Sequence, residues 1–192
     1  MKTKHVLPWL ILPGAILLAL VIRYGKPLTA GWLHSQTLAH LPMAGPVAHA
    51  ESSFEFTVHA PYESVVPLFG AHEERRWGGD AWNPEFLYPS PASDKLGEVF
   101  TVNHGGSRST WVNTAFDLTA GHIQYVYIVP DSVAVLIDIH VKRADSATTS
   151  VKVGYQHTAL RPESNAHVNE VARAHGEMGP HWAKALEECL KR

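Results

Sequence analysis

The sequence predicts an α+β domain in which an antiparallel sheet is covered by a long C-terminal helix, with an apolar segment before it. Alternating runs separated by turn residues repeat between residues 97 and 160, which is typical of an antiparallel meander. Apolar residues then recur at helical spacing toward the C-terminus. The chain has 192 residues, 45% hydrophobic and 18% charged, which suits one globular domain with an extension.

The first element is an uncharged apolar run over residues 6–22 with basic residues on both sides. As a helix, these seventeen residues are about 26 Å long, at the short limit for crossing a hydrocarbon core of about 30 Å. Trp9 and Tyr24 lie near its ends, where interfacial aromatic residues are common. We therefore expect a single-pass membrane anchor within residues 1–26, on a side that the balanced flanking charges leave open.

A cleaved secretory signal is the alternative for this segment, and a buried helix or hairpin is a third possibility. Leu28-Thr29-Ala30 is a poor cleavage site, whereas Ala48-His49-Ala50 matches well but lies far beyond the apolar run. Cleavage would make the protein secreted or periplasmic. Residues 27–52, rich in Pro, Gly, Ala and His, are expected to be a linker, and residues 53–192 the folded domain.

The domain begins with a strand, because Phe54, Phe56 and Val58 alternate with polar residues. Pro61 then opens a short helix that Gly70 ends. Turn residues separate the runs of the meander, so each run is expected to pair with the next. The predicted strands are residues 99–104, 110–116, 123–129, 133–141 and 149–160.

A long amphipathic helix follows the last strand, with Ser164 or Asn165 as its N-cap. Pro180 should kink this helix or split it in two, because proline lacks the backbone N–H that a helix interior needs. A sheet with one apolar face needs a cover, and this helix is the obvious candidate.

Several local sequences resemble, in order and spacing, those of the SRPBCC, or START-like, superfamily. Glu74-Arg75-Arg76-Trp77 followed by Trp82-Asn83-Pro84-Glu85 is similar to its E-x-x-W…W-x-P-E segment, with four residues between the tryptophans where the family has three. The resemblance covers about residues 53–190. It continues through Gly97-Glu98-Val99-Phe100, Trp111-Val112 with Phe116-Asp117, Gly121-His122-Ile123-Gln124-Tyr125, and Tyr155-Gln156-His157-Thr158-Ala159-Leu160.

This resemblance implies a helix-grip fold, in which a curved antiparallel sheet wraps a long C-terminal helix and encloses an apolar cavity. It implies a lipid, a polyketide-like molecule or an aromatic molecule as ligand, and it supplies no shared catalytic residues. Strand parity, the tryptophans, the tyrosines of the strand over residues 123–129 and the helical spacing near the C-terminus supply the candidate ligand-binding residues. They are Trp77, Trp82, Phe100, Val102, His104, Trp111, Tyr125, Tyr127, Ile137, Tyr155, His157, Met178 and Trp182.

His104 and His157 are the candidate catalytic residues, because each shares a strand face with apolar neighbours that would line a cavity. An inward imidazole can act as a general acid or base near neutral pH. The alternative is a structural histidine with a backbone or water partner. Glu74 or Arg76 is a further candidate, at the rim of the cavity, although the same charged run also fits a solvated turn.

The composition excludes other classes of site. Residues 51–192 carry twelve basic and eighteen acidic residues, and a net charge of −6 argues against nonspecific nucleic-acid binding. A single cysteine, Cys189, excludes a cysteine-rich zinc site, and the thirteen histidines show no paired metal-binding spacing. We therefore expect no metal and no cofactor.

Three functions remain open after these exclusions. The first is a membrane-tethered domain that binds a hydrophobic small molecule or a lipid. The second is a cyclase- or dehydratase-type enzyme acting on a polyketide-like or aromatic substrate, and the third is an interaction domain whose cavity is filled by side chains. The volume and polarity of the cavity distinguish them.

Overall fold

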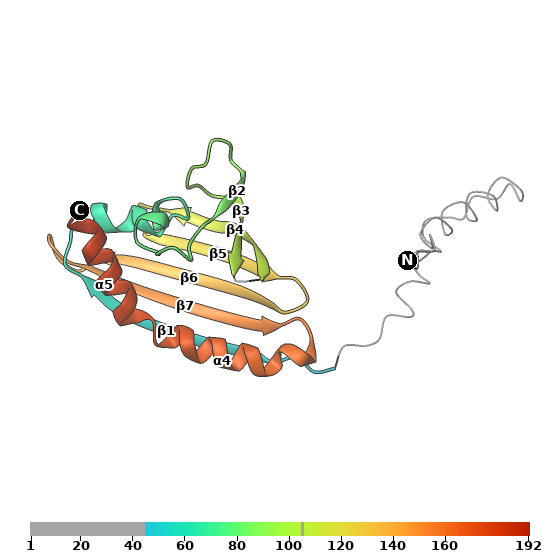
Figure 1. The fold of residues 1–192 in the computed structure, drawn as a ribbon. Coiled ribbons are helices and arrows are strands. Elements are labelled where there is room, and N and C mark those ends of the chain that lie inside the picture. The colour runs from blue at the N-terminus through green and yellow to red at the C-terminus, as the bar shows by residue number, and fades with distance from the viewer. Residues whose placement is uncertain (1–44, 105) are drawn as a thin grey trace, which may run out of the picture. The chain divides into compact units, whose positions relative to one another are not determined.

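Seven antiparallel strands form one curved sheet in the computed structural model, which describes residues 45–104 and 106–192 (Figure 1). The strands follow the order β1-β7-β6-β5-β4-β3-β2, so that the first strand pairs with the last and the others form a meander. Their bounds are β1 His49–Val58, β2 Glu85–Tyr88, β3 Val99–His104, β4 Ser107–Asp117, β5 His122–Val129, β6 Val133–Arg143 and β7 Thr149–Ala159.

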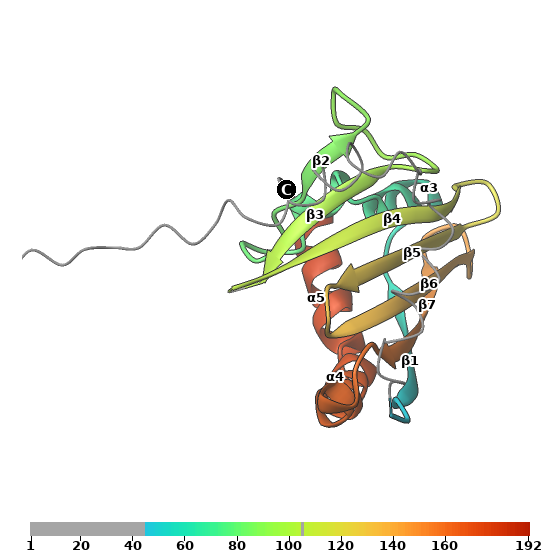
Figure 2. The same ribbon diagram turned by 90° about the vertical axis from the view of Figure 1, so that its right-hand side faces the viewer.

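The two faces of the sheet differ in polarity because side chains alternate along each strand. In β6, Val135, Ile137 and Ile139 are buried, while Leu136, Asp138 and His140 on the other face are half-buried. Directly opposed residues share a face, so the register carries this division from strand to strand. In Figure 2 the strands of the curved sheet follow one another from β2 at the top to β1 at the bottom, with α4 and α5 beside them.

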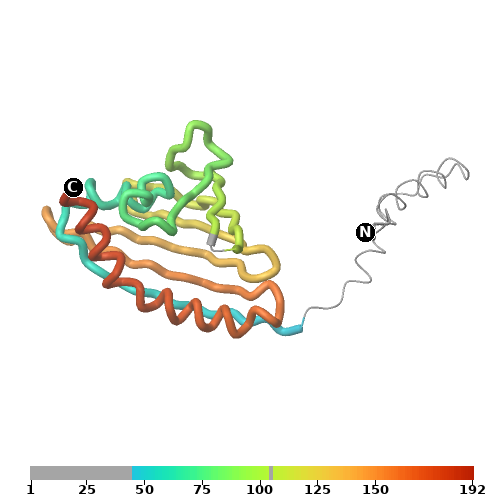
Figure 3. The backbone as a smooth tube through the Cα atoms, in the orientation of Figure 1, coloured from blue at the N-terminus to red at the C-terminus, as the bar shows by residue number. Residues whose placement is uncertain are grey.

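The C-terminal helices are α4, Asn165–Gly176, and α5, Gly179–Leu190. Pro180 lies in the first turn of α5, which confirms that the predicted helix is split there. Ser164 is the N-cap of α4, but no side-chain hydrogen bond caps this end; the Asn165 side chain instead accepts a hydrogen bond from the Ala48 N–H at 2.7 Å. The tube in Figure 3 follows α4 along β1 and β7 before α5 turns toward the C-terminus.

Three short helical segments connect β1 to β2: α3 Tyr62–Val65, η1 Val66–Phe69 and η2 Glu73–Arg76. Pro61 is the N-cap of α3, and Gly70 ends η1, as the sequence predicted. Val65, Leu68 and Phe69 are fully buried, or nearly so, and join the core formed by the inner face of the sheet. This packing holds the loop after Gly70 against the sheet.

Two parts of the sheet differ from the prediction. β1 begins at His49, so residues 49–52, expected to be linker, pair with β7 from Thr158 to Tyr155; polar residues there hide the alternation. β2 was not predicted, because it is a four-residue edge strand with mostly exposed side chains.

The predicted anchor over residues 6–22 lies outside the described residues. Within the described part of the chain, no helix combines the length and the apolar character needed to cross a bilayer.

Candidate functional site

A cavity of about 160 Å³ lies between the inner face of the sheet and the C-terminal helices. Strands β4 to β7 supply most of its wall, α4 and α5 supply one residue each, and the loop segment after η1 supplies the rest. The lining residues are Glu74, Trp82, Trp111, Tyr125, Tyr127, Ile137, Ile139, Tyr155, His175 and Trp182. This cavity argues against the third alternative, an interaction domain whose interior is filled by side chains.

Aromatic rings dominate this lining and hold one another in place. Trp111 stacks on Tyr127 with ring centroids 4.2 Å apart, and Trp82 meets Trp111 edge-on at 5.3 Å. On the helix side, Trp182 meets Trp77 edge-on at 5.2 Å. Such contacts stabilise ring positions beyond the burial of their area, so the cavity wall is largely preformed.

Glu74 reaches the cavity because the loop that carries it is fastened at several points. The Asp94 carboxylate accepts hydrogen bonds from the backbone N–H of His72 at 2.6 Å and of Glu73 at 3.1 Å. The Trp82 indole N–H donates to the Ala71 carbonyl at 2.9 Å. These contacts hold η2 beside the cavity, so that the Glu74 side chain faces it.

Gly70 makes that fastening possible. A Cβ atom at this position would lie 2.3 Å from the Asp94 Cγ, far closer than two carbon atoms can approach. The absence of a side chain at Gly70 therefore lets the Asp94 carboxylate reach the backbone of the loop.

The Glu74 carboxyl group is the most perturbed acid of the cavity. Burial raises its pKa to about 8, and the negative charge of Asp94 acts in the same direction. Its oxygens have no hydrogen-bond partner within residues 45–104 and 106–192. The group is therefore mostly a neutral acid at pH 7 and can serve either as a donor or, after ionisation, as a counter-ion.

Three tyrosines face the cavity in two different states. The Tyr125 hydroxyl is held by the framework: it lies 3.2 Å from both the Phe69 carbonyl and the buried Glu98 carboxyl, and it accepts the Ala71 N–H at 3.1 Å. The Tyr127 and Tyr155 hydroxyls have no protein partner in the described part of the chain, and burial raises the pKa of both, that of Tyr127 to about 12. These two hydroxyls are thus available to a bound molecule.

His157 does not line the cavity, which corrects the prediction that it points into it. Its ring is fully buried behind His175, and the two rings share a hydrogen bond of 2.9 Å between Nε2 of His157 and Nδ1 of His175. His175 faces the cavity instead, and burial, followed by the neighbouring His157, lowers its pKa to about 4. Both rings are therefore neutral at pH 7, because burial also lowers the pKa of His157.

Seven of the predicted binding residues lie in the lining: Trp82, Trp111, Tyr125, Tyr127, Ile137, Tyr155 and Trp182. Trp77, Phe100, Val102 and Met178 instead pack in or against the core. For Phe100 and Val102 on β3, strand parity identified the face but not the depth of the side chain. His104 ends β3, and its side chain lies outside the described part. Arg76 pairs with Glu73 at 2.9 Å and is exposed.

Ile139 and His175 line the cavity but were not among the predicted binding residues. Glu74 also lines it, and the sequence had offered it only as an alternative to Arg76 at the rim. Ile139 is two residues beyond Ile137 on β6, so the same parity rule could have found it. His175 stands on the apolar stripe of the predicted helix, a position that also indicates an inward side chain.

A second hollow of about 370 Å³ adjoins the first and shares Tyr127 and His175 with it. It lies between α4 and the ends of β5 and β6, with Val133, Val168 and Val171 among its lining residues. Tyr127 and His175 thus form part of the wall of both spaces.

No protein-family model matches the sequence, and no curated protein is significantly similar to it. Solved structures are similar in fold. Norcoclaurine synthase from Thalictrum flavum superposes with a TM-score of 0.56 at 12% identity, covering 79% of this chain and 98% of that one. A protein from Rhizobium leguminosarum gives 0.54 at 16% identity over 77% and 97%.

The protein Ara h 8.0201 superposes with a TM-score of 0.52 at 16% identity, covering 76% of this chain and its own chain completely, at 100%. All three are helix-grip proteins, and the described part of this chain matches them in its antiparallel sheet and C-terminal helices. The chain therefore has a helix-grip fold, as its sequence predicted.

Proposed function

We propose that the domain binds a small hydrophobic molecule, aromatic and bearing one amine or hydroxyl group, in the cavity beneath Glu74. The observation that carries this proposal is a preformed aromatic enclosure with a single unpartnered carboxyl group among its lining residues. Aromatic walls favour a flat apolar body, and a lone polar group fixes its orientation.

The size of the cavity supports a ligand with a single ring. About 160 Å³ is close to the roughly 150 Å³ of an engineered cavity that holds benzene. The adjoining hollow of about 370 Å³ offers room for a longer substituent or a path of entry past Tyr127 and His175. A larger lipid would need both spaces together.

The chemistry of Glu74 supports an amine or hydroxyl on that ring. Burial disfavours its charged form, and an ammonium group beside it would reverse this by pairing with the carboxylate. The Tyr127 and Tyr155 hydroxyls can hydrogen-bond a second polar group. A helix-grip neighbour, norcoclaurine synthase, is known in complex with dopamine and hydroxybenzaldehyde, which are molecules of this size.

Calorimetric titration of the purified full chain tests the proposal with dopamine and with 4-hydroxybenzaldehyde as probes. Glu74→Gln is expected to weaken dopamine binding at least tenfold and to leave the neutral aldehyde nearly unaffected. Glu73→Gln is the matched control, because Glu73 is the adjacent carboxylate and does not line the cavity. Failure of both probes, together with native mass spectra free of any co-purified small molecule, would contradict the proposal.

An acid–base enzyme is the second candidate, and the raised pKa of Glu74 is the observation that favours it. A carboxyl group with a pKa of about 8 can both give and take a proton near neutral pH. In a cyclase- or dehydratase-type reaction, Glu74 and a tyrosine hydroxyl would move the protons, in place of His104 and His157. If Glu74 acts as a general acid, the reaction rate should fall at high pH, and this fall should be absent in Glu74→Gln.

We further propose that residues 6–22 tether the domain to a membrane. A tether would raise the local concentration of membrane-borne apolar ligands near the cavity. The start of β1 at His49 supports an uncleaved chain, since cleavage after Ala50 would remove two paired residues of the sheet. Intact mass and resistance of the full chain to carbonate extraction test it; a mature chain beginning near residue 51 would contradict it.

A further inference from the structure

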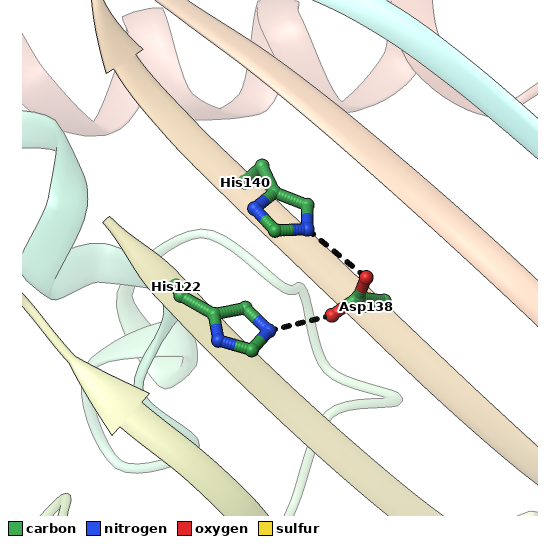
Figure 4. Close-up of side chains that lie close together, drawn as sticks. All are labelled: His122, Asp138 and His140. Carbon is green, nitrogen blue, oxygen red and sulfur yellow. Dashed lines mark hydrogen bonds and ion pairs between the residues drawn. The ribbon is translucent and has the colours of Figure 1, made fainter. Parts of the chain in front are cut away.

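Two histidines and an aspartate meet on the outer face of the sheet, on the side away from the cavity (Figure 4). Nε2 of His122 lies 2.7 Å from Oδ1 of Asp138, and Nε2 of His140 lies 3.0 Å from Oδ2 of the same carboxylate. The two imidazole rings are parallel within 4°, with centroids 4.8 Å apart. Each histidine therefore directs its Nε2 toward one of the two oxygens of the Asp138 carboxylate.

The strand register creates this arrangement. His122 on β5 is directly opposite His140 on β6, and Asp138 precedes His140 by two residues on the same face. Opposed side chains have Cβ atoms about 4.5–5.5 Å apart, so the register alone brings the three groups together. They are separated by up to eighteen residues in the sequence, which is why no sequence motif marked them.

We propose that His122, Asp138 and His140 bind a divalent transition-metal ion such as Zn²⁺. One potential ligand atom from each residue lies within 4.8 Å of the other two. A tetrahedral zinc ion with bonds of about 2.0–2.1 Å needs ligand atoms about 3.3 Å apart. All three side chains are between a third and a half exposed, so small side-chain rotations can reach that spacing.

The chemistry of the three ligands favours such an ion over calcium or magnesium, because two neutral imidazoles and one carboxylate suit zinc, copper and nickel. Three protein ligands leave at least one coordination position for water. A surface hollow of about 440 Å³ adjoins two of the three ligands, with Asp138, His140 and Gly154 in its lining. Gly154 is opposite Asp138 and contributes no side chain to fill that space.

The surroundings both support and oppose a cation. Gln124, directly opposite Asp138, donates from its amide to Oδ1 at 3.2 Å and so orients the carboxylate, as outer-shell groups do at metal sites. Lys152, opposite His140, carries a positive charge, but it pairs with Glu55 at 3.2 Å. Lys142 also faces this side of the sheet, so we expect moderate rather than tight affinity.

Calorimetric titration with ZnCl₂ tests the site by comparing the zinc affinity of the unsubstituted full chain with that of its variants. The full chain is expected to show a component of one ion per chain that weakens at least tenfold in Asp138→Asn and in His140→Ala. His181→Ala is the matched control, because His181 is an exposed histidine on α5 away from the cluster. Equal zinc affinity in all four proteins, or no one-to-one component in the unsubstituted chain, would overturn the proposal.

Electron paramagnetic resonance of the Cu²⁺-loaded, unsubstituted chain tests the site even where a variant fails to fold. The signal of the site is expected to show coupling to two imidazole nitrogens, and to one in His140→Ala. A spectrum without histidine nitrogen coupling would overturn the proposal. Because the cluster lies on the face opposite the cavity, neither result depends on the function proposed for the cavity.

Discussion

Replacing Glu74 by glutamine should change how the stability of the protein depends on pH. Burial raises the pKa of Glu74 from 4.5 to about 8, so the folded state binds this proton more tightly than the unfolded state. The resulting stabilisation is fully present below pH 4.5 and is lost as the pH rises through 8. Glu74→Gln keeps the shape of the side chain and removes this titration.

The size of the effect follows from the shift. Each pKa unit corresponds to about 1.4 kcal/mol, and integrating the linkage between pH 5 and pH 8 gives about 3 to 4 kcal/mol. In a domain of this length, that difference corresponds to about 6 to 16 °C in Tm. The unsubstituted chain should therefore lose that much more stability than Glu74→Gln between these two pH values.

Thermal or urea unfolding at pH 5, 6, 7 and 8 measures the difference, with Glu73→Gln as the parallel control. Other titrating groups, among them Glu98, whose pKa burial raises to about 7, are common to both proteins and cancel in the comparison. Stability curves of the unsubstituted chain and Glu74→Gln that stay parallel across this range would refute the assignment of a neutral Glu74 that faces the cavity.

Two further predictions concern the loop and the volume of the cavity. Gly70→Ala should destabilise the fold by at least about 2 kcal/mol, because the added methyl group displaces the Asp94 carboxylate from its two backbone donors. Gly154→Ala is the control: no atom lies closer than 3.9 Å to the added methyl group, so the free energy of unfolding should change by less than about 1 kcal/mol. Chemical unfolding measures both variants. Ile139→Phe should place a ring in the cavity and weaken binding of 4-hydroxybenzaldehyde at least tenfold, as measured by calorimetry. Ile128→Phe should leave this affinity unchanged, because Ile128 is 44% exposed on the outer face. Equal affinities in the two variants would show that the probe binds elsewhere.

Much of the fold was accessible from the sequence because it depends on local patterns. Strand alternation identified the five strands of the meander within a few residues, and Pro180 marked the break between α4 and α5. Alternation also put Tyr155 on the same face as Val151 and Val153, which is the inner one. It did not distinguish the two faces of the strand that carries Tyr125 and Tyr127, because both are apolar. Where alternation was masked, as in the polar start of β1, the boundary was misplaced.

Depth within the core was not accessible in this way. Phe100 and Val102 lie on the inward face of β3, and nothing in the sequence pattern distinguishes them from residues that line the cavity. Both are nevertheless fully buried, and Phe100 packs against Trp82 and Trp111. Whether an inward side chain reaches the cavity depends on what packs over it, which is a tertiary property. Glu74 illustrates the converse, since contacts with distant Asp94 turn a charged loop residue inward.

The outer cluster links the two faces of the sheet through one strand. Asp138 stands between Ile137 and Ile139 on β6, and both isoleucines line the cavity while Asp138 points to the other face. An ion held by Asp138 and His140 together with His122 would fasten β6 to β5 directly behind the wall on which a ligand packs. Ion binding on the outer face should therefore reduce the flexibility of this wall, and amide hydrogen exchange in β5 and β6 should slow on addition of Zn²⁺. The same addition to Asp138→Asn should leave that exchange unchanged; slowing in both proteins would show that the ion acts from another site.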